Sequence, residues 1–381
     1  MPATQHRHAR PGRSRLRRLA APFVVPAVFD FWAQRLHPSW TWERPLARIV
    51  ARHAAADDAV TLVLKPNRHW RGHLAGQHVN LAAEIDGVRT TRSYSLDDAP
   101  RADGLVSVTV KAIEGGRMSR HLHDAARVGD VLDIGPAFGE LVLPEAAAAP
   151  WLLLAGGSGI TPLMALVRAL AARVMPVPTT LVYSARTRGQ LCYVDELRAL
   201  ARRFPAFDVR FALTGGAASA ANGRAEDALA ADEHAGRIDG ALLASLLPDA
   251  AARHAYACGP SGFVTGMAGL LEGRVARFAS EAFTPPPRPS SVDADTGQVE
   301  VVLARSGRTL ALPRGTALLE ALEAQGLKPK HGCRMGVCNT CACGKAVGTT
   351  RDLRTGAANA EPALALKLCV SAAVSDLVLD L

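Results

Sequence analysis

The sequence contains little cysteine, and most of it is concentrated near one end. Seven cysteines occur in 381 residues, and five of them follow Cys258. An odd count with this clustering argues against a disulfide framework and favours metal ligation in a reducing compartment. A chain of this length exceeds what one hydrophobic core usually serves, so two or three domains are expected.

The sequence also lacks an uninterrupted apolar run that could cross a membrane. Residues 146–167 carry no charge and would be long enough to span a bilayer. They contain Pro150, the glycine loop 156–159 and Pro162, which instead indicate a strand, a loop and the start of a helix. We therefore expect no transmembrane segment.

Acidic residues are absent before Asp30, whereas six arginines lie in the first eighteen positions: Arg7, Arg10, Arg13, Arg15, Arg17 and Arg18. The net charge of +9 would suit nucleic-acid binding, but its concentration in this leader argues against that class. A basic leader can bind an anionic membrane surface or an acidic partner, and a solvated tail is the alternative. The apolar stretch that follows is short and broken by prolines, which does not suit an export signal. We expect a cytoplasmic protein, with peripheral contact at the inner face of the membrane left open.

Aromatic residues gather just after the leader, at positions 29–32 and 40–42. They could form a docking patch or a strap packed on the next domain. The strap is the favoured interpretation, because buried aromatic side chains usually serve packing.

Changes of pattern along the chain divide it into five segments. Residues 1–44 form a basic and aromatic extension, and residues 45–146 contain short β-runs that predict an antiparallel β-barrel or sandwich. Residues 147–283 alternate strands and helices, which predicts a parallel α/β sheet with ligands at the carboxyl ends of its strands. Residues 284–296 form a proline-rich linker, and residues 297–381 a small α+β module. The predicted strands are 60–64, 78–81, 106–110, 151–155, 180–184, 209–213 and 254–258, with a hairpin over 299–304 and 309–312; the predicted helices are 162–172, 194–203 and 317–325.

Three cysteines near the C-terminus carry the most specific motif. Cys333, Cys338 and Cys341 have the spacing C-x4-C-x2-C, and Cys369 follows, which is the plant-type pattern for a [2Fe–2S] cluster. A four-cysteine zinc site is the alternative, but structural zinc usually uses paired short knuckles. Cys343 lies two residues beyond Cys341 and could compete with it as a ligand.

Weaker motifs in the predicted barrel suit a flavin nucleotide. Tyr94 could stack beside an isoalloxazine ring, and Arg92 could donate to a phosphate. Lys111 leads into a glycine-rich turn before a predicted helix, where free N–H groups suit a pyrophosphate. Taken singly, each motif is more typical of a plain structural feature, a strand edge with an exposed arginine or an ordinary helix N-cap at Ser119.

A glycine loop at 156–162 follows a predicted buried strand and opens a helix. It is neither a GxGxxG fingerprint nor a P-loop, yet it suits the phosphates or the nicotinamide end of a dinucleotide. Arg186 and Arg188 follow the next strand, where the adenosine ribose would lie, and they favour the 2′-phosphate of NADPH over NADH. Cys258, with Gly259 and Pro260, ends a strand where the nicotinamide would arrive; a core cysteine before a turn is the alternative.

Together and in this order, the motifs at 92–95, 116–119, 156–162 and 258–260, with Glu281-Ala282-Phe283, resemble the ferredoxin–NADP reductase superfamily. The C-x4-C-x2-C module behind them is similar to the bacterial reductases with a C-terminal plant-type ferredoxin domain. Within that group, the order, spacing and N-terminal segment look most similar to the partners of membrane acyl desaturases. The resemblance covers residues 45–381.

The resemblance implies an antiparallel FAD-binding barrel, a Rossmann-like NADP domain and a β-grasp ferredoxin domain. Electrons would pass from NADPH to FAD, to the [2Fe–2S] cluster and to an external acceptor, a membrane desaturase or an oxygenase. Tyr94, Cys258 and Phe283 would lie at the catalytic centre. FAD would contact Arg92, Tyr94, Ser95, Lys111, Gly116, Met118 and Ser119; the nicotinamide cofactor, which could also be NADH, would contact Gly156, Gly157, Gly159, Thr161, Ser184, Arg186, Cys258, Gly259 and Pro260; the cluster ligands would be Cys333, Cys338, Cys341 and Cys369.

Two further hypotheses remain open at this point, a flavoprotein with a structural zinc module and a basic nucleic-acid-binding or redox-sensing protein. No histidine cluster of an oxygenase or desaturase occurs in the sequence, so the oxidising enzyme would be a separate protein such as a desaturase, Rieske oxygenase, cytochrome P450 or alkane hydroxylase. The surroundings of the cysteine loop also look basic, which would make this rim the specificity feature of the docking face: Arg334, Lys345, Arg351 and Arg354.

Overall fold

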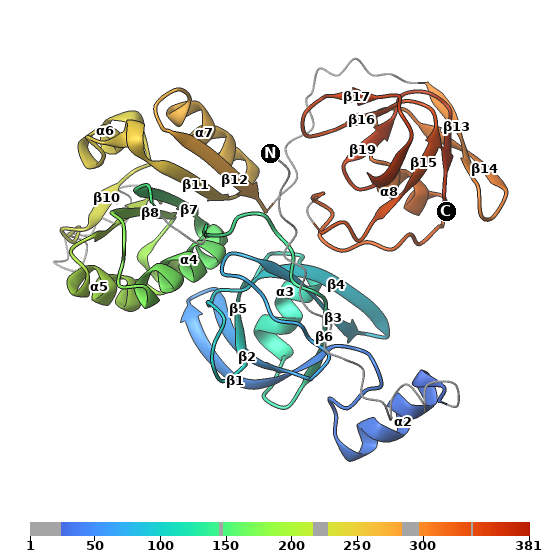
Figure 1. Cartoon of the computed structure of the whole chain (residues 1–381), viewed down its shortest axis with the longest axis horizontal. Helices are drawn as coiled ribbons and strands as arrows, with labels where there is room; N and C mark the ends of the chain where they lie inside the picture. The colour runs from blue at the N-terminus through green and yellow to red at the C-terminus, as the bar shows by residue number, and fades with distance from the viewer. Residues whose placement is uncertain (1–23, 145–147, 216–227, 284–296, 337) are drawn as a thin grey trace.

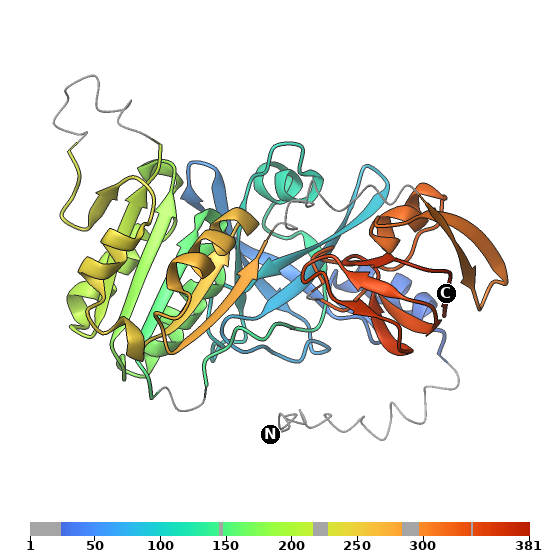
Figure 2. The same ribbon diagram turned by 90° about the horizontal axis from the view of Figure 1, so that it is seen from above.

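The computed structural model describes residues 24–144, 148–215, 228–283, 297–336 and 338–381. Figure 1 shows three domains, with an antiparallel barrel between an α/β domain and a C-terminal domain. The perpendicular view in Figure 2 again places the barrel in the middle. The arginine-rich leader and the predicted linker 284–296 lie outside the described residues.

The barrel domain is built from six antiparallel strands, as its short β-runs predict. The hydrogen-bonded order is β4-β3-β6-β1-β2-β5, so β4 is an outermost strand. Alternating apolar residues of β2, β3 and β5 fill the interior, including Leu62, Val79 and Val108, which are fully buried. The elements are β1 (Leu46–Ala56), β2 (Ala59–Pro66), β3 (His78–Ile85), β4 (Val88–Ser95), β5 (Val106–Lys111), helix α3 (Arg117–Arg120), a π-helical turn (His121–Ala125) and β6 (Val131–Ile134).

The α/β domain has a six-stranded parallel sheet in the order β10-β9-β8-β7-β11-β12. The strands are β7 (Trp151–Gly156), β8 (Thr179–Ala185), β9 (Phe207–Leu213), β10 (Glu233–Ala235), β11 (His254–Gly259) and β12 (Arg277–Ala282). Helices α4 (Ile160–Ala172) and α5 (Val194–Arg203) cover one face, and α6 (Gly240–Leu246) and α7 (Ser261–Leu271) the other, as Figure 1 shows. Short 3-10 turns occupy Gly157–Gly159, Arg188–Gln190 and Ala250–Ala252. The strand order reverses direction at β7 and β11, where open α/β sheets bind their ligands.

The C-terminal domain is a mixed sheet that packs on one helix. The five-stranded sheet has the order β14-β13-β20-β15-β18, and a smaller sheet has the order β17-β16-β19. Leu318 and Leu322 on the helix are fully buried with Val301 of the sheet. The elements are β13 (Gln298–Leu303), β14 (Arg308–Pro313), α8 (Leu318–Ala324), β15 (Ala342–Val347), β16 (Thr350–Asp352), β17 (Ala358–Asn359), β18 (Ala363–Lys367), β19 (Ser371–Ala373) and β20 (Leu377–Leu379).

The aromatic segment before the barrel is only partly a packed strap. Its helix α2 (Pro26–Leu36) projects from the barrel in Figure 1. Phe29 packs edge-to-face on Trp42 with ring centroids 5.2 Å apart, as a strap would. The other large apolar residues stay in solvent and form what we call the apolar face of α2: Val25, Val28, Phe31, Trp32 and Leu36. Among the described residues, no helix is both long and apolar enough to cross a bilayer.

Candidate redox site

The hairpin of β3 and β4 carries the predicted flavin motif and sets the geometry of the site. In its antiparallel register, His78 lies opposite Ser95, and Asn80 opposite Ser93. Because side chains alternate along a strand and directly opposed residues share a face, these four residues lie on one face of the hairpin. This face is where both neighbouring domains make contact with the barrel.

His78 connects the hairpin to the α/β domain. Its Nε2 lies 3.3 Å from a carboxylate oxygen of Glu281, and its ring meets the Phe283 ring edge-to-face at 6.0 Å. Burial lowers the pKa of His78 to about 4. Burial, with a smaller contribution from the charge of Glu140, raises the pKa of Glu281 to about 7. Sequence reasoning did not single out His78, because one histidine in a β-run carries no functional signal.

Asn80 connects the same face to the cysteine loop. Its side-chain amide donates to the hydroxyl of Thr340 at 3.1 Å, and the Ser93 hydroxyl donates to its carbonyl oxygen at 2.6 Å. A Cβ added at Gly332 would lie 2.9 Å from the Asn80 amide nitrogen, so the loop backbone approaches closely. Thr340 lies between two of the predicted cluster cysteines. Asn80 was also missed from the sequence, since its partner is 260 residues away.

The three residues of the flavin motif differ in exposure and direction. Arg92 is exposed, and its guanidinium donates to the Thr91 carbonyl at 2.7 Å. Tyr94 is half-buried against the barrel core, and this desolvation raises its pKa. Ser95 is buried, and strand alternation directs it to the face opposite that of Tyr94. Because β4 is an outermost strand, residues on both faces of the sheet could contact a ring system bound at its edge.

The glycine turn before α3 packs beside this hairpin, because α3 contacts both β3 and β4. A Cβ at Gly116 would lie 2.3 Å from the Ser119 hydroxyl, so the turn requires glycine. The Ser119 hydroxyl donates to the Gly116 carbonyl at 3.2 Å and accepts from the N–H of Ile113 at 3.3 Å. Met118 is a core residue, so only its backbone could reach a ligand. Ser119 therefore shapes the turn, and the N–H groups of the turn are what remain for an anion.

Lys111 lies near the glycine loop of the α/β domain. It pairs with Asp58 at 3.0 Å and lines a small cavity with Gly157 and Thr161. The Thr161 hydroxyl donates to the Ser158 carbonyl at 3.0 Å and so braces the loop.

The glycine loop and the Cys258-Gly259 strand end are pressed together. A Cβ at Gly159 would lie 1.9 Å from the carbonyl oxygen of Cys258, and one at Gly156 would lie 2.8 Å from the Phe263 ring. The Cys258 thiol is fully buried, and burial together with nearby Glu281 raises its pKa. Phe283 donates its N–H to the Gly259 carbonyl at 2.9 Å, which anchors it beside this strand end. Pro260 is exposed at the start of α7.

The two arginines after β8 that favoured NADPH differ in their charge partners. The guanidinium of Arg188 forms an ion pair with Glu233 at 2.6 Å, so its charge is already compensated. Arg186 is exposed, and no carboxylate of the described chain pairs with it. Ser184 is half-buried at the same strand end. Arg186 is therefore the better placed of the two for an added phosphate.

The four cluster cysteines lie in two pairs. The N–H of Cys333 donates to the Cys338 sulfur at 3.2 Å, and the N–H of Cys338 donates to the Cys333 sulfur at 3.4 Å. Cys341 and Cys369 form the second pair through a thiol hydrogen bond. In each pair, a hydrogen bond between the two thiols lowers the pKa of the thiol that accepts it, Cys338 or Cys341. The same bond raises the pKa of the partner, Cys333 or Cys369. Backbone N–H groups directed at sulfur, as in this loop, suit a [2Fe–2S] centre.

Two pairs of thiols fit a binuclear centre better than a single zinc ion. Within the described ranges, no group of three or more His, Cys, Asp or Glu side chains is placed to hold one metal ion. Cys343 belongs to the hydrophobic core of the domain, and burial raises its pKa to about 11. It lies in neither pair.

The four residues predicted to form a basic rim around the cysteine loop differ in exposure and in their partners. Lys345 is 2% exposed, and its ammonium donates to the carbonyls of Gly348 and Asn359. Arg334 pairs with Glu323, and Arg354 pairs with Asp352 at 2.8 Å. The prediction was wrong for Lys345, because sequence spacing does not reveal its carbonyl partners. Arg354 is exposed beside the loop, where a Cβ added at Gly336 would lie 3.0 Å from its guanidinium, but a carboxylate compensates its charge. Arg351 is half-buried.

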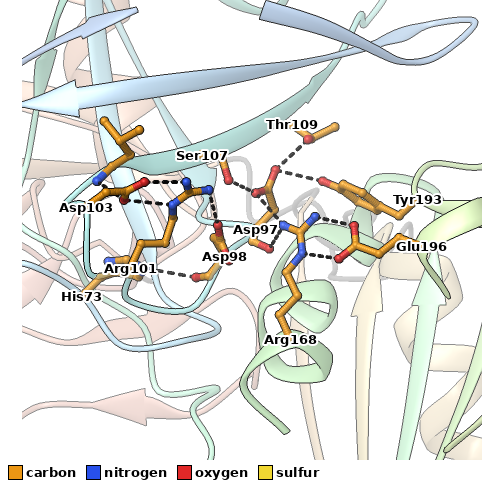
Figure 3. Close-up of polar contacts among 11 residues, drawn as sticks. His73, Asp97, Asp98, Arg101, Asp103, Ser107, Thr109, Arg168, Tyr193 and Glu196 are labelled. Atoms are coloured by element: carbon orange, nitrogen blue, oxygen red, sulfur yellow. Dashed lines mark hydrogen bonds and ion pairs between the residues drawn. The ribbon is translucent and has the colours of Figure 1, made fainter. Parts of the chain in front are cut away.

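A buried carboxylate ties the barrel to the α/β domain, as Figure 3 shows. Asp97 follows β4 and is fully buried. It accepts hydrogen bonds from Ser107 and Thr109 of its own domain, the latter at 2.6 Å. From the other domain, the Tyr193 hydroxyl donates to it at 2.9 Å, and Arg168 donates to its backbone carbonyl at 2.7 Å.

Arg168 extends this link to a third element. Its guanidinium lies 3.3 Å from the Asp97 carboxylate and binds Glu196 of α5 through two nitrogens at 2.8 and 2.7 Å. The opposite charges raise the pKa of Arg168 despite its partial burial. We call Asp97, Arg168, Tyr193 and Glu196 the interdomain clamp.

Three family models match the chain in succession. They are the oxidoreductase FAD-binding domain over residues 47–142, the oxidoreductase NAD-binding domain over 153–268 and the 2Fe-2S iron-sulfur cluster binding domain over 301–373. Each lies on one of the three structural domains described above.

Two relatives align with this chain over nearly its whole length. An NADPH oxidoreductase of Mycobacterium tuberculosis is 33% identical over 382 residues, covering 97% of this chain and 93% of that protein. The glycine betaine monooxygenase reductase subunit of Pseudomonas aeruginosa is 28% identical, covering 95% of this chain and all of that protein. The solved structure of phthalate dioxygenase reductase matches with a TM-score of 0.56 at 24% identity, over 88% of this chain and 97% of that one, and supports the fold.

Proposed function

The chain belongs to the ferredoxin–NADP reductase superfamily, with a C-terminal [2Fe–2S] domain, and on this premise we propose that it donates electrons to a separate oxygen-activating iron enzyme. It is an NAD(P)H-dependent flavin and iron–sulfur oxidoreductase. Its cofactors are FAD, NAD(P)H and the [2Fe–2S] cluster. FAD supplies the conversion between a hydride, which carries two electrons, and a cluster that accepts one electron at a time.

The chain's own residues would bind and orient these groups. The β3–β4 hairpin would carry the flavin, with the glycine turn before α3 on its pyrophosphate. The loop 156–161 and the Cys258-Gly259 strand end would position the nicotinamide, and Phe283 would cover the flavin. Cys333 with Cys338, and Cys341 with Cys369, would each hold one iron.

One observation carries this proposal. His78 and Asn80 are two residues apart on β3, about 7 Å along the strand, and the first contacts the α/β domain while the second contacts the cysteine loop. The hydride-donating side and the one-electron side therefore meet on the same short hairpin. Electron transfer from one carrier to the next requires the two carriers to lie close together. Domains with unrelated functions would not need to contact the same hairpin.

Removing the Asn80 contact tests the proposal. In N80A the hydrogen bond to Thr340 is lost, so the cysteine loop is held less firmly on the hairpin. We expect electron transfer from flavin to cluster to slow roughly five- to tenfold, the equivalent of about one hydrogen bond, while flavin reduction by NADPH keeps its rate. Rapid mixing, with each centre followed by its absorption, separates the two phases.

Thr91→Ala is the matched control, because Thr91 lines the same cleft between the barrel and the C-terminal domain but makes no described side-chain contact across it. Equal slowing of both phases in N80A, or equal effects in the two variants, would contradict the proposed role of the hairpin.

For the nicotinamide cofactor, NADPH is favoured by Arg186. Its exposed guanidinium follows β8, where the ribose of a bound dinucleotide lies in this topology, and it is free of ion pairs to the described carboxylates. A 2′-phosphate would supply the partner that this arginine lacks. Arg188, in contrast, already has Glu233.

For the acceptor, a membrane acyl desaturase is proposed first and a soluble oxygenase second. The exposed apolar face of α2 favours an acceptor in the membrane. The reductase would meet this acceptor at the cytoplasmic surface of the bilayer. The relative named as a reductase subunit of glycine betaine monooxygenase favours an oxygenase. Combining the holoprotein and NADPH with desaturase-containing membranes, or with a purified oxygenase, decides between them. Reductase-dependent product should form either with the desaturase membranes or with the oxygenase. If no product forms with either acceptor, both assignments are refuted.

A further inference from the structure

Helix α2 presents large apolar side chains to solvent, whereas the side that packs on the protein carries a buried carboxylate. Trp32 is 63% exposed and Leu36 81%, whereas Asp30 is 6% exposed and Ala33 7%. At 100° per residue, positions 28, 32 and 36 lie on one side of the helix, and 30 and 33 on the opposite side. A helix packed on a globular domain normally shows the reverse arrangement, so the apolar face of α2 is a surface that no described residue covers.

The inversion is held in place by specific contacts. The Asp30 carboxylate accepts a hydrogen bond from the N–H of Trp42 at 2.6 Å. Downstream, the Asn67 amide donates to the carbonyls of Ser39 and Arg44, both at 3.0 Å, which fixes this segment on the barrel. The side of the helix that carries Asp30 is therefore the anchored side, and the apolar face of α2 is held outward.

The exposed charge on α2 and the charges that line the cavity beside it are basic. Arg35 is the only charged side chain on the exposed side of the helix, and its guanidinium lies 3.9 Å from the centre of the Phe31 ring. A cavity of about 430 Å³ beside the helix is lined by Arg48, Lys65 and Arg68 and by no carboxylate. None of these three cations pairs with a carboxylate in the part of the chain that the structure describes. The preceding sequence adds six arginines and has no acidic residue.

We propose that the apolar face of α2 docks this protein on a bilayer surface that contains anionic phospholipid. The apolar side chains would enter the interfacial layer, where Trp is favoured, and the cations would face the head groups. An eleven-residue helix is too short to span the hydrocarbon core, so it would lie on the surface. A second copy is a poorer occupant, because a two-fold contact would bring Arg35 and the basic cavity toward their own copies. The proposal does not depend on which acceptor the protein serves.

Vesicle binding by the FAD- and cluster-loaded protein tests this surface. We expect sedimentation with phosphatidylcholine vesicles that contain phosphatidylglycerol, much weaker sedimentation with phosphatidylcholine alone, and release by high salt. In the double variant Phe31→Ser, Trp32→Ser the affinity for the anionic vesicles should fall about tenfold or more, since two large apolar side chains are lost. Leu364→Ser is the matched control, because Leu364 is 99% exposed on the C-terminal domain and should leave binding unchanged.

Two other measurements keep the outcomes distinct. Reduction of flavin and cluster by NADPH should be unchanged in the double variant, which shows that it is folded and separates this proposal from the redox function. Equal binding of wild type and double variant to anionic vesicles would overturn the proposal. So would a wild-type dimer in sedimentation that the double variant abolishes without any vesicle binding, because the face would then join two copies.

Discussion

Glu281 lies where burial and a neighbouring carboxylate both oppose its ionisation. Its pKa is raised to about 7, mainly by burial and also by Glu140, while burial lowers the pKa of His78 to about 4. The two side chains are 3.3 Å apart at the β3–β12 contact, with the buried Cys258 thiol nearby. At neutral pH His78 is therefore uncharged and Glu281 is about half ionised, so a rise in pH through this range completes a negative charge in the contact.

The Glu281 carboxyl predicts a pH-dependent loss of stability. Because its folded-state pKa exceeds its ordinary value of 4.5, its stabilising contribution is complete below that value and disappears as the pH rises through about 7. In E281Q this term is absent. From about pH 6 to about pH 8, wild type should lose about 1 kcal/mol more than the variant in urea-induced unfolding of the α/β domain. Parallel pH profiles for the two proteins would show that Glu281 does not titrate in this range.

Asp97 is the residue on which the interdomain clamp depends. Asp97→Asn keeps the shape but removes a buried charge that Arg168 and Tyr193 share. We expect a loss of about 2 kcal/mol or more in unfolding free energy and slower flavin reduction by NADPH, because the nicotinamide domain is held less firmly. The control is Asp103→Asn, since Asp103 forms an exposed pair with Arg101 in the same loop. Equal effects of the two variants on flavin reduction would rule out a clamp.

At the scale of single elements, Cys341 and Cys343 are close in sequence but are assigned different roles, the first as a cluster ligand and the second as a core residue of β15. Cys343→Ala removes a core thiol on β15, whereas Cys341→Ala breaks the pair with Cys369. We expect the first variant to keep the visible spectrum of the [2Fe–2S] centre and the second to lose it. Iron and acid-labile sulfide analysis of the two purified variants checks this, and loss of iron in Cys343→Ala alone would reverse the assignment.

Elements whose signal is local could be predicted from the sequence. Helix α5 spans the predicted residues 194–203, and the glycine loop follows β7 as the strand–loop–helix pattern requires. The C-x4-C-x2-C motif was equally informative, since all of its members lie within one loop. In each case a few neighbouring residues determine the structure, either through burial of an apolar run or through a backbone turn that needs glycine.

Features that depend on distant partners could not be predicted. Asn80 and Asp97 look like ordinary polar residues until the fold brings Thr340 and Arg168 to them. Lys345 was expected on a basic rim and instead lies buried, with two backbone carbonyls as partners. The aromatic segment was expected to be mainly a packed strap, because aromatic side chains usually pack inward. Instead, the hydrogen bond of Asp30 helps to anchor one side of helix α2, and the apolar face of α2 stays exposed.

At the scale of the whole molecule, the barrel is the meeting point of two different kinds of carrier. The α/β domain reaches it through Glu281 and Phe283, and the C-terminal domain reaches it through Thr340. The hydrogen bonds and ion pairs of the clamp hold the first domain on the barrel, whereas the polar contact described for the second is the hydrogen bond from Asn80 to Thr340. This asymmetry suits a reductase in which the nicotinamide domain stays in place and the cluster domain must also meet an external acceptor.

The most direct test of this account is anaerobic rapid mixing of the holoprotein with NADPH or NADH, with flavin and cluster absorption followed separately. We predict that the flavin is reduced first and the cluster second, in one ordered sequence, and that NADPH acts faster than NADH because of Arg186. Reduction of the cluster before the flavin, or a cluster that stays oxidised beside fully reduced flavin, would contradict the central claim. Equal rates with the two nucleotides would remove the proposed role of Arg186 alone.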